Sequence, residues 1–166
     1  MLATIRSIEN GEAYEARFER VLGGYSVASV WAMLTENEQL AKWFPELSVA
    51  DLCVGGAFKF DMGGGNEEQM EILALEPLAV LAYTWAEDRV RFELDETPEG
   101  CRLVLIERIA RITDHTPRDL AGWHVCLDVI VALLDGRTVE SRKALWEKEY
   151  EAYKQLIERV RADVSE

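Results

Sequence analysis

The stretch from Thr116 to Gly136, TPRDLAGWHVCLDVIVALLDG, constrains the fold most, because it reads as one helix with both ends marked. Thr116 can cap the free amides, Pro117 suits the first helical position, and Asp135-Gly136 is typical of a helix end. Apolar residues recur at steps of four, three and four, which places them on one side of the helix. They are Trp123, Leu127, Ile130 and Leu134. That side has to be buried, and a long helix laid over a curved antiparallel sheet is one way to bury it.

The chain before this helix contains six or seven segments that read as short strands, because apolar and polar residues alternate in them. A hairpin is expected at Asn10-Gly11, followed by a strand from Tyr14 to Leu22. Two short helices are expected between Ser26 and Phe44. From Leu47 onward the two-residue period returns, with turn signals at the spacing of an antiparallel meander.

A second amphipathic helix is expected after Gly136, because aromatic and apolar residues recur there at steps of four and three. They are Trp146, Tyr150, Tyr153, Ile157 and Val160. We therefore expect a domain over residues 1–137 and a C-terminal helical extension over residues 138–166. This extension is expected to pack on the domain or on a second copy of the chain, as in a homodimer.

Composition excludes several classes of partner. The 166 residues carry a formal net charge of -13, which opposes the cation-driven binding of nucleic acid. The longest clean apolar run, Val129 to Leu134, is far shorter than the ~20 residues that cross a bilayer, so no membrane insertion is expected. Cys53, Cys101 and Cys126 are odd in number and lie in apolar sequence, so we expect small buried hydrophobes in a reducing compartment. With no apolar run typical of a signal peptide near the N-terminus, the expected location is cytoplasmic.

Four segments resemble the START-like (SRPBCC) superfamily, and within it bacterial relatives of the activator of heat-shock protein 90 ATPase homologue family. They are RFERVLGGYSVASVWAMLTENEQLAKWF, VGGAFKFDM, LEPLAVLAYTW and AGWHVCLDVIVALLDG. The resemblance covers Tyr14 to Gly136. It implies an α+β fold of the helix-grip (START-like, Bet v-like) type, in which a curved antiparallel sheet wraps around the long C-terminal helix. It also implies an internal cavity for an apolar ligand.

The expected wall of this cavity combines aromatic and apolar side chains from the short helices, the sheet and the long helix. These residues are Trp43, Phe44, Phe58, Phe60, Met70, Tyr83, Trp85, Trp123, Leu127 and Ile130. Aromatic rings bring a large buried area, and Tyr and Trp add a polar group that can orient a ligand. The alternative is that these side chains fill the space completely and form an ordinary core.

His124 and Asp128 lie four residues apart on the long helix, so the carboxylate can hold one ring nitrogen while the other nitrogen faces outward. Such a pair can act in general acid-base catalysis, or it can be a structural hydrogen-bonded pair. His115 has no second His or Cys at ligand spacing, and Gly63-Gly64-Gly65 is followed by acidic residues instead of a phosphate-binding Lys. We therefore expect no metal and no cofactor.

Three functions follow from these features. The leading hypothesis is non-enzymatic binding of a small hydrophobic molecule, such as a lipid, in the internal cavity. The second, implied by the resemblance, is a chaperone-linked or stress-response interaction protein; the eukaryotic co-chaperones carry a separate chaperone-binding domain, which we do not expect in this chain. The third is an enzyme of the cyclase or hydrolase type that uses His124.

Overall fold

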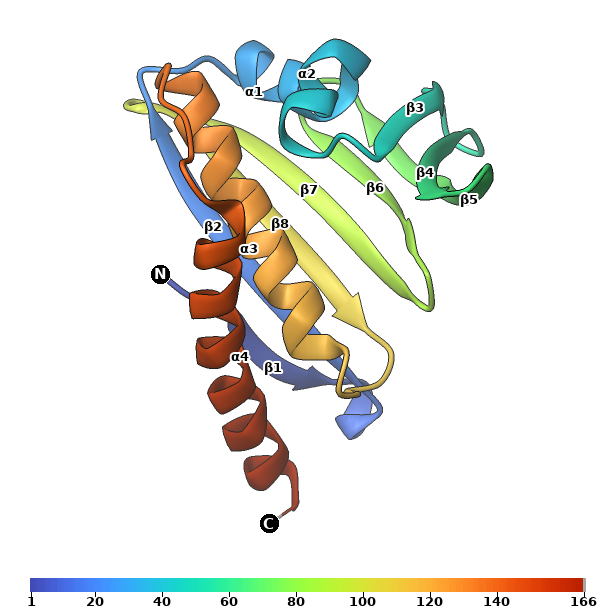
Figure 1. Cartoon of the computed structure of the whole chain (residues 1–166), viewed down its shortest axis with the longest axis vertical. Helices are drawn as coiled ribbons and strands as arrows, with labels where there is room; N and C mark the ends of the chain where they lie inside the picture. The colour runs from blue at the N-terminus through green and yellow to red at the C-terminus, as the bar shows by residue number, and fades with distance from the viewer. Residues whose placement is uncertain (166) are drawn as a thin grey trace. The chain divides into compact units, whose positions relative to one another are not determined.

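The computed structural model describes residues 1–165 and joins eight strands of this range into one sheet (Figure 1). The strands are β1 Thr4–Ile8, β2 Ala13–Gly23, β3 Leu47–Asp51, β4 Ala57–Gly63, β5 Asn66–Glu76, β6 Val80–Trp85, β7 Asp88–Thr97 and β8 Gly100–Ile109. Their order in the sheet is β1-β2-β8-β7-β6-β5-β4-β3, so β3 to β8 form the predicted antiparallel meander. Short β3 lies at the edge and pairs with β4, and it begins at Leu47, where the two-residue period was expected to return.

The chain divides into two units, which are described one at a time. Unit 1 combines residues 1–18 with the chain from Arg108 onward, and unit 2 comprises residues 19–107. Unit 1 therefore holds β1, the start of β2 and two long helices. Unit 2 holds the meander and two short helices.

In unit 1 the stretch with the strongest helix signal forms α3, Thr116–Leu134, as predicted (Figure 1). Asp135 follows as the C-cap, and Gly136 has the positive φ of 71° that suits glycine at a helix end. The predicted cap by Thr116 is wrong. His115 occupies the N-cap position, and the Thr116 hydroxyl accepts a hydrogen bond from the Thr113 amide at 2.9 Å. The hydroxyl therefore closes the preceding turn.

The second helix of unit 1, α4, spans Arg142–Ser165 and packs against α3. Figure 1 shows α4 running beside α3 and continuing past β1. Its inner face buries Tyr153 and Ile157, while Trp146 and Tyr150 are half-buried. β1 pairs with β2 in antiparallel register, and the turn between them is the 3-10 helix η1, Glu9–Gly11. The hairpin expected at this point is therefore present, with a longer turn than the dipeptide signal indicated.

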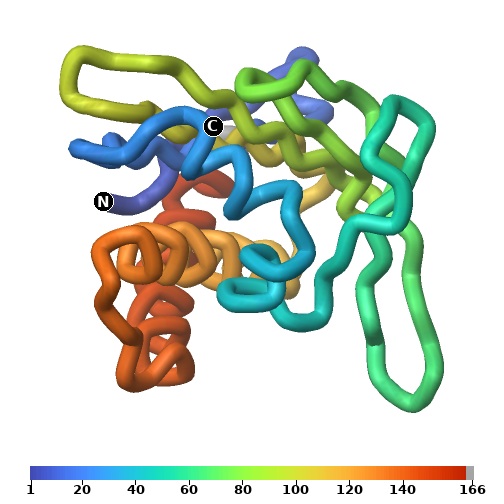
Figure 2. Tube along the Cα trace, turned by 90° about the horizontal axis from the view of Figure 1, so that it is seen from above, coloured from blue at the N-terminus to red at the C-terminus, as the bar shows by residue number. Residues whose placement is uncertain are grey.

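Unit 2 begins its helical part with α1, Val27–Thr35, followed directly by α2, Asn37–Trp43. The Ser26 hydroxyl caps α1 by accepting from the Ser29 amide at 3.1 Å. In the meander, β4 and β5 are joined by the turn at Gly63-Gly64-Gly65, where all three φ angles are positive. Figure 2 shows the chain reversing at the end of this hairpin. The three glycines therefore form a turn, as expected.

Two further sequence expectations can be compared with the structure. Cys101 and Cys126 are buried cysteines outside any disulfide, as predicted, but Cys53 is exposed, so the prediction for Cys53 is wrong. Cys53 lies in the loop between β3 and β4, outside the strands of the sheet. Within residues 1–165, no helix combines the length and apolar character needed to span a membrane.

Candidate functional site

Three aromatic rings of unit 2 form a triangle, which we name the aromatic triangle: Phe44, Phe60 and Trp85. The ring centres lie 5.7 Å apart for Phe44 and Phe60, 5.9 Å for Phe44 and Trp85, and 5.8 Å for Phe60 and Trp85. All three pairs meet edge to face, which is a favourable geometry for aromatic rings. Each of the three residues is only partly buried. The triangle therefore combines a fixed aromatic arrangement with access to solvent.

A second aromatic group lies next to the triangle and is fully buried. Phe58 stacks on Tyr83 with 4.4 Å between ring centres, and Phe92 lies 6.2 Å from Tyr83. Tyr83 also contacts Trp85 of the triangle at 6.5 Å. Met70, the register partner of Phe58 on β5, is buried beside them. This inner group is core, and it supports the triangle from one side.

The strand period explains why these rings meet. Phe58 and Phe60 are two residues apart on β4, and Tyr83 and Trp85 are two residues apart on β6, so each pair shares one face of the sheet. Phe44 enters from the end of α2. Its neighbour Trp43 is buried and donates its indole N–H to the carbonyl of Met33 in α1 at 2.6 Å, which fixes the end of α2.

The structure thus brings together seven of the ten residues predicted to line a cavity, all of them in unit 2. They are Trp43, Phe44, Phe58, Phe60, Met70, Tyr83 and Trp85. The other three, Trp123, Leu127 and Ile130, are buried residues of α3 in unit 1, and their role as ligand contacts stays a prediction. Phe92 belongs to the cluster but was not predicted as a site residue. Phe92 lies two residues from Val90 and from Leu94 on the buried face of β7, and this period indicates only a core position.

His124 is buried in unit 1, and both of its ring nitrogens face polar atoms. Nδ1 lies 2.8 Å from the hydroxyl oxygen of Tyr153 on α4. Nε2 lies 3.5 Å from a carboxylate oxygen of Asp128 and 3.7 Å from one of Glu149. Tyr153 and Glu149 were not predicted as partners, because the contact between α3 and α4 is not visible in local sequence. A catalytic role of His124 and Asp128 stays a prediction.

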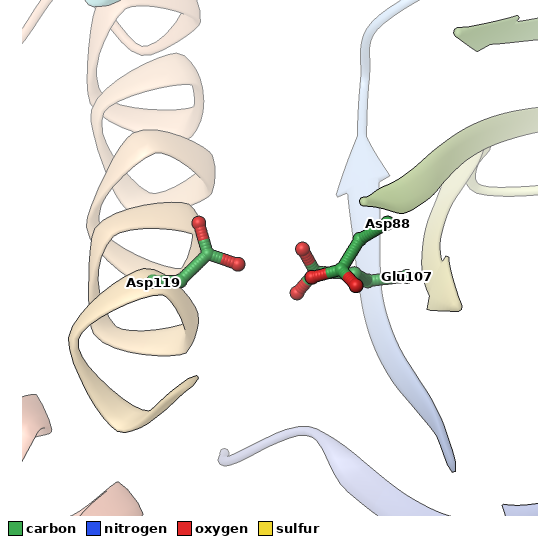
Figure 3. A group of neighbouring side chains, drawn as sticks. All are labelled: Asp88, Glu107 and Asp119. Atoms are coloured by element: carbon green, nitrogen blue, oxygen red, sulfur yellow. The ribbon is translucent and has the colours of Figure 1, made fainter. Parts of the chain in front are cut away.

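A buried acid lies in β8, where sequence reasoning predicted none. Glu107 is fully buried, and its carboxylate lies within 4.8 Å of that of Asp88 at the start of β7 (Figure 3). Figure 3 also draws Asp119, which belongs to α3 in unit 1. The period-two series Leu103, Leu105, Glu107 places this acid on a buried face and was the available signal. Two carboxylates are ligands that hard cations prefer, and the absence of a metal site stays a prediction.

Comparison with protein families shows which family the chain belongs to. The model of the family described as "Activator of Hsp90 ATPase homolog 1-like protein" matches residues 25–135. The chain belongs to this family. The match of this Hsp90-activator-like family spans all ten predicted cavity residues and ends at the C-cap of α3. The START-like resemblance and the α+β helix-grip fold predicted from the sequence are thereby confirmed.

Solved structures share the fold over more of the chain than the family match. A protein of unknown function from Enterococcus faecalis, EF2215, has 25% identity and a TM-score of 0.81, over 95% of this chain and 91% of that one. CalU16 from Micromonospora echinospora has 23% identity and a TM-score of 0.71, over 93% of this chain and 96% of that one. The protein encoded by BPP1335 from Bordetella parapertussis has 26% identity and a TM-score of 0.69, over 85% of both chains. No curated protein matches the chain.

Proposed function

We propose that this chain binds a small hydrophobic molecule without transforming it, and that the aromatic triangle is its contact surface. The observation that carries this proposal is the partial exposure of Phe44, Phe60 and Trp85 in a fixed edge-to-face arrangement. An apolar core would bury such rings, because each fully buried large apolar side chain stabilises the fold by about 1.5–3 kcal/mol. Membership of a family with a small-molecule-binding fold supports the same function.

The triangle suits a flat apolar ligand. In an edge-to-face arrangement, some ring faces and some ring edges stay uncovered. A planar ligand can place its own edge or face against one of them and so add a further edge-to-face contact. The buried group of Phe58, Tyr83 and Phe92 prevents the triangle from collapsing inward. A ligand would therefore meet a surface that is largely formed before binding, which lowers the entropy cost of association.

The first experiment is native mass spectrometry of the freshly purified full chain, which reports any co-purifying molecule together with the assembly size expected for a monomer or a homodimer. The chain is then titrated with a panel of lipids, sterols and flavonoids, and binding is measured by tryptophan fluorescence and by the shift in melting temperature. Phe60→Ala should weaken binding of an active compound about fivefold, from the loss of one aromatic contact. Val54→Ala is the control, because Val54 is an exposed apolar residue of the same unit outside the triangle.

Two results would remove this proposal. One is silence of the whole panel together with an empty native mass spectrum. The other is a compound that binds equally well to the wild-type chain and to Phe60→Ala, because the triangle would then not be its site. We propose a cytoplasmic location, since Cys53, Cys101 and Cys126 form no disulfide with one another, which suits a reducing compartment.

A second candidate is a chaperone-linked interaction in the stress response. The description of the family as activators of the Hsp90 ATPase favours it. The test is the rate of ATP hydrolysis by a purified Hsp90-type chaperone, measured with and without the full chain. An unchanged rate, together with no retention of the chain by the immobilised chaperone, would eliminate this candidate.

A further inference from the structure

A groove in unit 1 runs between the start of α3 and the part of α4 from Tyr150 to Arg161. Its residues come from 113–118 and 150–161, and we name it the α3–α4 groove. Its volume is about 360 Å³, at the lower end of the range of small-molecule sites. The aromatic triangle lies in unit 2, so this groove is a different feature with its own chemistry.

Three cations line the α3–α4 groove, and each is held by a contact within unit 1. The guanidinium carbon of Arg118 lies 5.1 Å from the centre of the Tyr150 ring, and Nζ of Lys154 lies 5.3 Å from the same centre. Nη2 of Arg161 donates a hydrogen bond to the carbonyl of Ile112 at 3.1 Å. A ring face and a carbonyl restrict a cation without removing its charge. An anion in the groove would therefore meet cations whose positions are already restricted.

The groove also has an apolar wall. Pro117 and Ile157 are buried residues that line it from α3 and α4. The Tyr150 ring is supported from behind by Trp146, with 4.9 Å between ring centres and an interplanar angle of 87°. Trp146 in turn donates its indole N–H to the Arg118 carbonyl at 3.2 Å. A ligand ring can rest on this wall while a charged group reaches the cations.

The charges of the groove select the charge of the ligand. Asp114 and Glu158 line it as well, so three cations stand against two carboxylates, in a chain whose net charge is -13. Lys154 also lies 3.7 Å from Glu151. With Lys154 close to this carboxylate, Arg118 and Arg161 are the cations that face a ligand. A ligand with one negative charge meets them with little repulsion from the acids, whereas a dianion would bring its second charge close to the acids. We propose that the α3–α4 groove binds a small aromatic monocarboxylate.

The test uses nuclear magnetic resonance on the full chain labelled with nitrogen-15, with three probes. They are 1-naphthoate, its neutral counterpart 1-naphthamide, and inorganic phosphate. We expect 1-naphthoate to shift amide signals of residues 113–118 and 150–161, and 1-naphthamide to bind at least tenfold more weakly. Added salt should weaken the binding of 1-naphthoate, because partly exposed charges are screened.

Variants show whether the named cations hold the carboxylate. Arg118→Gln and Arg161→Gln should each weaken 1-naphthoate binding about tenfold, which is the effect of losing one hydrogen bond to a charged group. Lys148→Gln is the matched control, because Lys148 is an exposed cation of α4 outside the groove, and it should change the affinity less than twofold. The melting curve of each variant shows that the fold is kept. If one Arg variant does not fold, the affinity of the other variant for 1-naphthoate still tests the proposal.

Several outcomes would overturn the proposal. They are no shift with 1-naphthoate, equal binding of 1-naphthamide, phosphate binding as strong as that of 1-naphthoate, or unchanged affinity in both Arg variants. Shifts confined to the signals of Phe44, Phe60 and Trp85 would also overturn it, while supporting the function proposed for unit 2. Shifts confined to residues of the groove would support the present proposal and would not test the function proposed for unit 2. Each proposal can therefore fail without the other.

Discussion

Tyr153 connects three segments of unit 1 through one buried hydroxyl group. The backbone amide of Ala3 donates a hydrogen bond to this oxygen at 2.9 Å, and Nδ1 of His124 lies 2.8 Å from it. The amide can only donate, so the single hydroxyl proton is available for Nδ1. We therefore infer that Nδ1 accepts and that Nε2 carries the proton, facing the acceptor oxygens of Asp128 and Glu149.

The change Tyr153→Phe removes the oxygen and keeps the ring. The amide of Ala3 and Nδ1 of His124 would then be left in buried positions, since each residue is only 4% exposed. An unsatisfied buried polar group costs about 1–3 kcal/mol, so the loss of the two bonds should lower the free energy of unfolding by about 3 kcal/mol. For a chain of this length that corresponds to a fall in melting temperature of about 6–12 °C.

Urea unfolding and calorimetry measure this loss, and Tyr150→Phe is the matched control on the same helix. Tyr150 is half-buried, and removal of its hydroxyl should change the free energy of unfolding by less than about 0.5 kcal/mol. Nitrogen-15 chemical shifts of His124 provide a second measurement, with Nε2 expected to carry the proton in the wild type. Equal stability of the two variants, or a proton on Nδ1, would refute the reasoning.

Three further predictions concern two glycines and the exposed thiol. Gly56→Ala should cost more than about 2 kcal/mol in urea unfolding, because the new Cβ would overlap the carbonyl oxygen of Asp51 and lie 2.9 Å from that of Cys53. Gly122→Ala should instead stabilise by about 0.5–1 kcal/mol, since its Cβ would meet no described atom within 4 Å apart from the neighbouring backbone of α3 itself, and α3 gains helix propensity. Local desolvation, followed by the hydrogen bond and charge of Asp51, raises the pKa of the Cys53 thiol, so less of the reactive thiolate forms at pH 8. Cys53 should therefore react with iodoacetamide more slowly than a free cysteine, and Asp51→Asn should increase the rate; no increase would exclude a role of Asp51.

The sequence predicted those ends and turns that are determined by residues within a few positions of one another. The end of α3 at Asp135-Gly136 and the turn at Gly63-Gly64-Gly65 both follow from glycine at positive φ. The two wrong predictions concern a side chain that forms a different local hydrogen bond and a cysteine that lies in an exposed loop. The hydroxyl of Thr116 accepts a hydrogen bond from the Thr113 amide, and Cys53 is exposed in the loop between β3 and β4.

The candidate site was predictable only in part, for a geometric reason. The two-residue strand period places Phe60 beside Phe58 and Trp85 beside Tyr83 on one face, so membership of the aromatic cluster could be predicted. Which of these rings stay accessible depends on packing between elements, and periodicity does not encode it. The partner of His124 is Tyr153, which is 29 residues away on another helix, and the relative rotation of two helices is likewise absent from a local pattern.

The rotation of α4 about its axis connects the buried hydroxyl of Tyr153 to the α3–α4 groove. Successive helical residues are roughly 100° apart, so Tyr150, Ile157 and Arg161 lie within about 80° of Tyr153 on the same side of α4. The Tyr153 hydroxyl accepts from the Ala3 amide and bonds Nδ1 of His124, and these two hydrogen bonds tolerate little rotation, because they weaken steeply when the angle departs from linear. The bond to His124, which joins α4 to α3, and the bond from Ala3, which joins α4 to the segment before β1, therefore also determine which α4 side chains face the groove.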